Sequence, residues 1–167
     1  MSKSPIHWMV EPLRRYADFR GRSRRAEFWW WMLGYFLVTA VLWAIIFSGF
    51  PWDVVNAEPG SAEMPDPEGG PFALFGIGTW IGGIAYFIFW AATVIPNLAV
   101  TVRRLHDRGM SGWWYGGLLI ANFIPLLNIF TIFGFLALFV ICALPGEAAE
   151  NRWGLDPKGA GQAAVFE

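Results

Sequence analysis

Uncharged hydrophobic runs alternate with charged segments along the chain, and the first two runs predict membrane spans. Residues 28–50 carry no charged side chain, and a helix of that length exceeds the ~20 residues that cross a ~30 Å hydrocarbon core. Residues 72–102 form a longer uncharged run, in which Pro96 should bend or interrupt a helix. Gly78 and Gly82 in this run have the spacing that lets two helices pack closely.

The third uncharged run, residues 113–144, is too long for one straight span. As a single helix it would be roughly 48 Å long, about 18 Å more than the hydrocarbon core requires. Pro125 near its middle removes a backbone hydrogen-bond donor, and Asn122 and Asn128 can bond locally to a turn. These features favour a helical hairpin. One long kinked span is the alternative, because the first helix of such a hairpin would span only about 20 Å.

The charged segments between the runs predict the orientation of the chain. Residues 1–27 carry seven Lys or Arg side chains against three acids, whereas residues 51–71 carry five acids and no base. Basic residues near membrane ends stay in the cytoplasm. We therefore expect the amino terminus and the arginine-rich loop 103–112 on the cytoplasmic side and the acidic loop outside. The side of the tail, residues 145–167, depends on whether the third run crosses once or forms a hairpin.

The alternation divides the chain into seven segments. The acidic loop is rich in proline and glycine and should lack regular structure. The seven segments are a basic interfacial segment (1–27), span one (28–50), the acidic extracytoplasmic loop (51–71), span two (72–102), a cytoplasmic charged loop (103–112), the hairpin or single long span (113–144) and a polar tail (145–167).

The predicted fold class is all-α. We expect a polytopic membrane helical bundle of four hydrophobic helices, namely two full spans and a C-terminal hairpin with helices near 112–124 and 127–144, preceded by an interfacial amphipathic segment. Three spans are the alternative.

Aromatic residues are placed where membrane anchors are expected. The interfacial segment mixes Trp8, Leu13, Tyr16 and Phe19 with basic residues, a composition typical of a helix whose aromatic rings lie at headgroup depth. Tryptophans also gather at the ends of the uncharged runs, as amphipathic rings do at an interface. The interface anchors predicted in this way are Trp29, Trp113 and Trp114.

Composition supports the membrane class and limits the chemistry. The chain is 56% hydrophobic and only 15% charged, whereas soluble proteins average about 25% charged residues. Cys142, the one cysteine, lies in an apolar run, so it cannot form an intrachain disulfide and we expect it to pack in the core. With two histidines far apart, we expect no metal site and no cofactor. Nucleic acid is not an expected partner.

The loop after span two carries more charge than a topology signal needs. If span two continues as a helix past Val102, Arg103 and Arg104 lie four and three residues from Asp107, so one carboxylate can pair with two guanidinium groups. Gly109 would then end the helix and Ser111 could cap the next one. A stop signal explains the arginines alone, but not the histidine and aspartate between them.

Three charged motifs lie around the apolar runs: "FRGRSRRAEFW" (19–29), "RRLHDRGMSGWW" (103–114) and "NRWGLDP" (151–157). They resemble those of the family known as domain of unknown function 805 (DUF805), the YhaH-like bacterial inner-membrane proteins. The family commonly has Tyr and Pro where this chain has Trp153 and Leu155. The resemblance covers nearly the whole chain apart from the acidic loop, and implies an inner-membrane location but no activity. The positions that match are Phe19, Gly21, Arg22, Arg25, Glu27 and Trp29; Arg103, Arg104, Leu105, His106, Asp107, Ser111, Gly112 and Trp113; and Asn151, Arg152, Gly154, Asp156 and Pro157.

These motifs suggest one polar cluster at the cytoplasmic membrane interface. Guanidinium groups at headgroup depth attract lipid phosphates, each basic residue adding about 1 kcal/mol. We expect the cluster to fix the bundle and to recognise an anionic group such as a lipid headgroup, provided that the tail lies on the same side. The candidate residues are Arg22, Arg25, Glu27, Arg103, Arg104, His106, Asp107, Ser111, Asn151, Arg152 and Asp156.

The sequence favours a small inner-membrane binding or interaction protein. Its expected partners are the lipid bilayer, an anionic phospholipid, and a second copy or another membrane protein. An oligomeric transporter or channel component is the alternative, although the spans carry few of the polar side chains that line a transport path. A lipid-modifying enzyme using His106 and Asp107 is less favoured, because the only nearby hydroxyl is Ser111 and no oxyanion donors are recognisable. No catalytic residue is therefore assigned.

Overall fold

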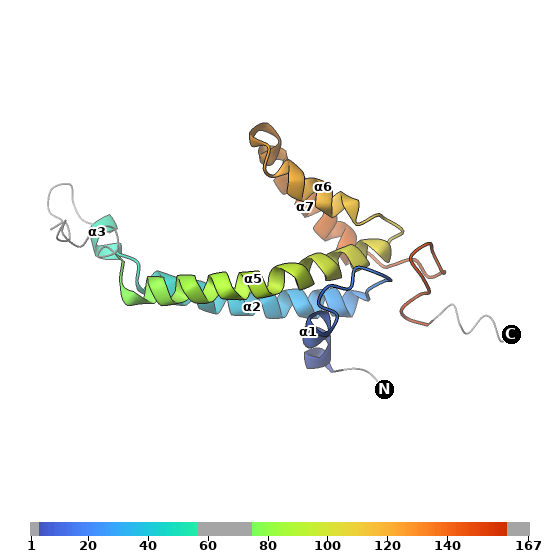
Figure 1. Ribbon diagram of the computed structural model, residues 1–167, viewed down its shortest axis with the longest axis horizontal. Helices are drawn as coiled ribbons and strands as arrows, with labels where there is room; N and C mark the ends of the chain where they lie inside the picture. The colour runs from blue at the N-terminus through green and yellow to red at the C-terminus, as the bar shows by residue number, and fades with distance from the viewer. Residues whose placement is uncertain (1–3, 57–74, 160–167) are drawn as a thin grey trace. The chain divides into compact units, whose positions relative to one another are not determined.

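A computed structural model describes residues 4–56 and 75–159, and all regular elements in these ranges are helices (Figure 1). The predicted all-α class is thereby confirmed. Three of the helices, α2, α5 and α7, are long and apolar enough to cross a membrane. The helices are α1 (Pro5–Arg14), α2 (Arg25–Ser48), α3 (Trp52–Asn56), α5 (Ile77–His106), α6 (Trp113–Ala121) and α7 (Pro125–Ala143).

Two boundaries differ from those expected. The acidic loop was expected to lack regular structure, but Trp52–Asn56 forms the short helix α3, and residues 57–74 lie outside the described ranges. Span two was expected to end at residue 102, whereas α5 continues through Pro96 and on to His106. The extension carries Arg103, Arg104 and His106 in the last turn, where positive side chains interact favourably with the helix dipole.

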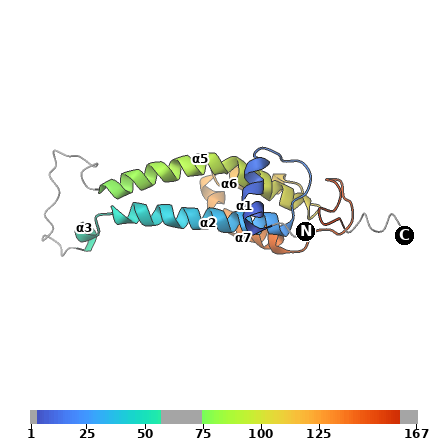
Figure 2. The same ribbon diagram turned by 90° about the horizontal axis from the view of Figure 1, so that it is seen from below.

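The chain divides into two compact units. Unit 1 comprises the residues up to Gly34 and those from Thr93 onward, and unit 2 comprises Tyr35–Ala92. In unit 2, α2 and α5 lie side by side (Figure 2). A Cβ atom on Gly78 would lie 2.6 Å from Ser48 Oγ, and one on Gly82 would lie 2.8 Å from Ile46. The close helix packing predicted from this pair of glycines is therefore present.

In unit 1 the third uncharged run is broken into two helices that pack against each other (Figure 1). The first helix, α6, ends at Ala121, earlier than expected, and α7 begins at Pro125, since proline suits the first turn of a helix. Asn128 Nδ2 donates to Asn122 Oδ1 at 2.9 Å across the turn. The break is thus the hairpin turn that Pro125 and the two asparagines predicted.

The hydrophobic core of unit 1 joins three helices next to the charged segments. Phe28 and Trp31 come from α2, Val100 and Leu105 from α5, and Leu138 and Cys142 from α7. Trp31 Nε1 also donates to Asn97 Oδ1 at 2.6 Å. Cys142 is buried and free, as expected of a packing residue. This core fixes the ends of α2, α5 and α7 on which the candidate site is built.

Candidate functional site: a buried ion-pair network

Three arginines and two carboxylates form a buried ion-pair network at the junction of α2, α5 and the tail. Its members are Arg22, Glu27, Arg103, Arg104 and Asp107, each with a side chain at most 5% exposed. Arg22 Nε donates to Asp107 Oδ1 at 2.9 Å, and Arg103 Nη2 donates to Glu27 Oε1 at 2.6 Å. Arg104 donates to the other oxygen of Asp107. All five residues belong to unit 1.

Asp107 does pair with two guanidinium groups, but not with the two expected from the sequence. Arg104, three residues earlier, is one partner, and Arg22 takes the place of Arg103. Helical spacing is not lost at Asp107, because its backbone N–H donates to the carbonyl of Arg103 at 3.1 Å and Arg104 pairs with it at i,i+3. Arg103 instead points to the first turn of α2, where Glu27 lies.

The remaining donors of Arg104 cap the C-terminal end of α7. Its Nε donates to the carbonyl of Cys142 at 2.9 Å, and its Nη2 donates to the carbonyl of Leu144. The last carbonyls of a helix have no partner within the helix, and a positive group there also favours the helix dipole. Arg104 therefore joins the end of α5 to the end of α7.

Arg22 organises the tail in the same way. Its guanidinium donates to the carbonyl of Ala149 at 2.7 Å, to that of Gly154 at 3.3 Å and to that of Glu147. The backbone N–H of Glu147 in turn donates to the carbonyl of Asp107 at 2.9 Å. A Cβ atom on Gly146 would overlap the Asp107 carboxylate, so only glycine allows this approach. The tail is thereby fixed to the charged loop.

The segment before α2 is attached by Arg103. Its Nη1 donates to the carbonyl of Asp18, whose carboxylate accepts from Arg15 Nη2 at 2.6 Å and from the backbone N–H of Arg20 at 3.0 Å. Burial alone would raise the pKa of Asp18. These hydrogen bonds, with the charges of Arg15 and Arg103, outweigh it and hold the pKa below the ordinary value of 3.8.

His106 lies beside the network without pairing with Asp107. Its Nδ1 lies 3.1 Å from the carbonyl of Gly21, and its ring stacks on Trp153 with the ring centres 3.7 Å apart and the planes 5° from parallel. The Asp107 carboxylate is bonded to arginines instead. The two residues are thus not arranged as a catalytic His–Asp pair in this structure.

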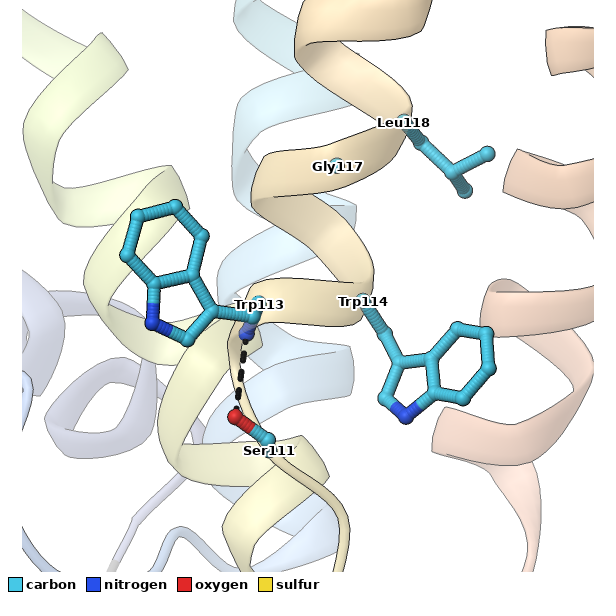
Figure 3. Close-up of a pocket in the computed structure, with 5 residues that line it drawn as sticks. All are labelled: Ser111, Trp113, Trp114, Gly117 and Leu118. Atoms are coloured by element: carbon cyan, nitrogen blue, oxygen red, sulfur yellow. Dashed lines mark hydrogen bonds between the residues drawn. The ribbon is translucent and has the colours of Figure 1, made fainter.

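Two hollows at the start of α6 share Ser111 and Trp113 in their linings. One, of about 500 Å³, is lined by Phe19, Val102, His106, Ser111, Gly112, Trp113 and Trp153. The other, of about 370 Å³, is lined by Ser111, Trp113, Trp114, Gly117 and Leu118 (Figure 3). Figure 3 shows the rings of Trp113 and Trp114 projecting to opposite sides of α6. We call them the His106 pocket and the α6 hollow.

Comparison with known proteins identifies the family of the chain. The family described as "Protein of unknown function (DUF805)" matches residues 16–155, a range that contains the whole ion-pair network. The chain belongs to DUF805. Inner membrane protein YhaH of Escherichia coli (strain K12) is 32% identical over 153 residues, which cover 92% of this chain and 98% of YhaH. Inner membrane protein YhaI of the same strain is 31% identical, covering 92% and 97%. No solved structure matches the chain.

Most of the residues selected within the DUF805 motifs come together, and three do not. Arg25 is exposed at the start of α2, and Asp156 Oδ1 accepts from the backbone of Lys158 at 2.9 Å in a local turn. Ser111 Oγ accepts from the Trp113 backbone at 3.4 Å, although Gly112 is the N-cap of α6. The selected residues that form the network are Arg22, Glu27, Arg103, Arg104 and Asp107. His106, Asn151 and Arg152 lie beside it, bonded to the carbonyls of Gly21, His106 and Gly109 respectively.

The predicted anchors differ in exposure. Trp113 and Trp114 are 77% and 61% exposed, as expected of rings that can reach an interface. Trp29 is half-buried against the core, with its ring centre 4.9 Å from that of Phe139. The Trp29 ring therefore packs within the protein, whereas the rings of Trp113 and Trp114 are exposed.

Sequence reasoning missed the backbone acceptors of the network and the role of Asp18. The carbonyls of Cys142, Leu144 and Ala149 carry no side-chain signal. Gly146, next to a proline at the end of an apolar run, gave the one available hint of a tight approach there. The donors could thus be found in the DUF805 motifs, but their acceptors could not.

Proposed function

We propose that this DUF805 protein is an inner-membrane binding protein that recognises anionic phospholipid headgroups with exposed basic side chains arranged around the ion-pair network. In this proposal the amino terminus, the charged loop and the tail all lie on the cytoplasmic side. The inner-membrane names of YhaH and YhaI support the location, and the excess of basic residues before α2 supports the orientation.

One observation carries the proposal: some arginines of unit 1 are buried in the network, while others are exposed around it. The buried arginines of the network donate most of their N–H groups to carboxylates and carbonyls, and these bonds hold the fold; Arg103 Nε is buried without a partner among the described residues. Arg20, Arg25 and Arg152 are exposed and lie on segments that the network fixes. Exposed guanidinium groups next to a bilayer attract phosphate, each by about 1 kcal/mol.

The tryptophans at the start of α6 are consistent with the same role. Trp113 and Trp114 are exposed immediately after the charged loop, and tryptophan is enriched at the level of lipid headgroups. A cationic rim beside exposed tryptophans suits an anionic headgroup whose hydrocarbon chains lie in the bilayer. The headgroup would therefore contact the rim rather than the network itself.

Native mass spectrometry of the full chain released from lipid nanodiscs tests this function. With anionic and zwitterionic phospholipids in equal amounts, we expect retained anionic lipid on the wild type. The triple variant R20A/R25A/R152A should lose most of it, and the matched variant R20K/R25K/R152K should keep most of it, because the attraction is largely one of charge. Equal retention by the alanine variant would contradict the proposal. A retained second copy or another protein in place of lipid would identify an interaction protein instead.

A further inference from the structure

The His106 pocket contains a polar atom that the fold itself does not use. His106 is only 5% exposed and lines the pocket. Its Nδ1 faces the carbonyl of Gly21 at 3.1 Å, and since a carbonyl can only accept, Nδ1 must carry the proton. The neutral ring then offers Nε2 as an acceptor. Among residues 4–56 and 75–159, nothing hydrogen-bonds to Nε2.

The ring of His106 is held in place, so its free acceptor has a fixed direction. Trp153 stacks on it with the ring centres 3.7 Å apart, and Asn151 Nδ2 donates to the His106 carbonyl at 3.0 Å. A group fixed before a ligand arrives loses little conformational entropy on binding. A side chain held in this way can bind a ligand as well as pack in the fold.

Ser111 and the aromatic walls define what the pocket can accept. The Ser111 hydroxyl already accepts from the Trp113 backbone, so its own hydrogen is available to a ligand oxygen. The pocket therefore presents the acceptor Nε2 and the donor hydroxyl of Ser111, with the rings of Phe19, Trp113 and Trp153 around them. Trp153 Nε1–H is a further buried donor that has no hydrogen-bond partner among the described residues. A ligand hydroxyl group, which both donates and accepts, matches Nε2 and the Ser111 hydroxyl.

A cationic group and an apolar surface lie next to the pocket. The Arg152 guanidinium lies over the Trp153 ring at 4.9 Å and donates to the Gly109 carbonyl at 3.3 Å, while the residue remains exposed. The α6 hollow, which shares Ser111 and Trp113 with the pocket, is open at Gly117, where a Cβ atom would meet nothing within 4 Å (Figure 3).

We infer that the His106 pocket selects an anionic phospholipid whose headgroup carries a free hydroxyl, as a phosphoglycerol headgroup does. The hydroxyl lies between His106 Nε2 and Ser111, the phosphate lies near Arg152, and one hydrocarbon chain runs along the α6 hollow past Gly117. This inference rests on the proposed function, because it names which anionic lipid the exposed rim retains.

The test compares two lipids of equal charge that differ in the hydroxyl groups. Full-length protein in nanodiscs is offered phosphatidylglycerol and phosphatidylethanol with matched acyl chains, in a phosphatidylcholine background, and retained lipid is measured by native mass spectrometry. We expect a several-fold preference of the wild type for phosphatidylglycerol. H106N, whose amide can keep the bond to Gly21 but lacks Nε2, and S111A should both reduce that preference towards one.

A third variant tests the hydrocarbon part of the site without removing a polar group. G117L fills the α6 hollow and should lower retention of both anionic lipids several-fold. G83L is the matched control, since a Cβ atom on Gly83 also meets nothing within 4 Å and this residue lies on α5 in unit 2; it should retain lipid like the wild type.

The outcomes separate the two proposals. A wild type that holds phosphatidylglycerol and phosphatidylethanol equally, both above phosphatidylcholine, overturns the hydroxyl site and leaves anionic recognition intact. An unchanged preference in folded H106N and S111A also overturns it, as does full retention by G117L. No preference for either anionic lipid over phosphatidylcholine overturns both proposals.

Discussion

At the scale of single residues, Asp107 joins separate segments of the sequence through both its carboxylate and its backbone carbonyl. Its carboxylate accepts from Arg22 and Arg104, and its carbonyl accepts from the backbone of Glu147. Residues 22, 104 and 147 are far apart in the chain, so one aspartate holds three segments together. A buried charge is tolerated only when it is paired and hydrogen-bonded, and removing one partner leaves the others uncompensated.

We therefore expect D107N to destabilise unit 1 strongly. The amide keeps the size of the side chain but leaves two buried guanidinium groups without their counter-charge, a loss of about 3–5 kcal/mol for a buried pair. E150Q makes the same chemical change at an exposed position and should alter stability by less than about 0.5 kcal/mol. Unfolding in detergent, followed by tryptophan fluorescence, measures both variants. Equal stability of the two would show that the network does not hold the fold.

Asp18 gives a pH-dependent prediction. Because its pKa in the folded protein is below 3.8, the unfolded chain binds the proton more readily, and the stabilisation is fully present above that value. It is lost as the pH falls through the lower, folded pKa. D18N should accordingly be less stable than the wild type at neutral pH, and the difference should shrink in acid below 3.8. Melting temperatures of both proteins across that range are the measurement, and a difference that grows in acid would contradict the assignment.

The arginine donors of the network could be predicted from the sequence, but only some of the groups that accept their hydrogen bonds could. Two arginines spaced three and four residues from an aspartate suggested the pairing, yet Arg103 turned to Glu27. Helical spacing describes neighbours on one helix and carries no information about a second helix that approaches the same face. The same limit hid the carbonyl acceptors on the tail.

At the scale of elements, the hydrophobic runs predicted the helices better than their ends. Spans at 28–50 and 72–102 correspond to α2 and α5, but α5 extends through the arginines to His106. The uncharged run ends at Val102, whereas tertiary partners for each buried arginine allow the helix to continue. In the hairpin, Pro125 located the break, but nothing in the sequence showed that α6 would end as early as Ala121.

The glycines of α5 provide a test of element packing. G82L would place side-chain atoms where Ile46 lies, since even a Cβ atom comes within 2.8 Å; overpacking of this kind costs about 1–3 kcal/mol. G83L meets open space and should be neutral or slightly stabilising, because leucine favours a helix by up to about 1 kcal/mol over glycine. Thermal unfolding in detergent compares them. A G82L variant as stable as G83L would mean that α2 and α5 do not pack through this glycine.

At the scale of the whole molecule, both the charge distribution and the structure bear on which segments share one side of the membrane. The sequence concentrates basic residues before α2 and acids after it. The structure bonds the segment before α2, the end of α5 and the tail to one another. The α6–α7 hairpin therefore begins and ends next to the same network, which supports our proposal that the tail lies on the same side of the membrane as the charged loop.

Cysteine labelling tests this central claim most directly. In a C142A background, which removes the one native thiol, single cysteines are placed at Arg20, Glu150 and Asn56, all exposed, and treated with a membrane-impermeant thiol reagent in intact cells and in inverted membrane vesicles. We predict that positions 20 and 150 react only in inverted vesicles and position 56 only in intact cells. Labelling of positions 20 and 150 from opposite sides would contradict the account.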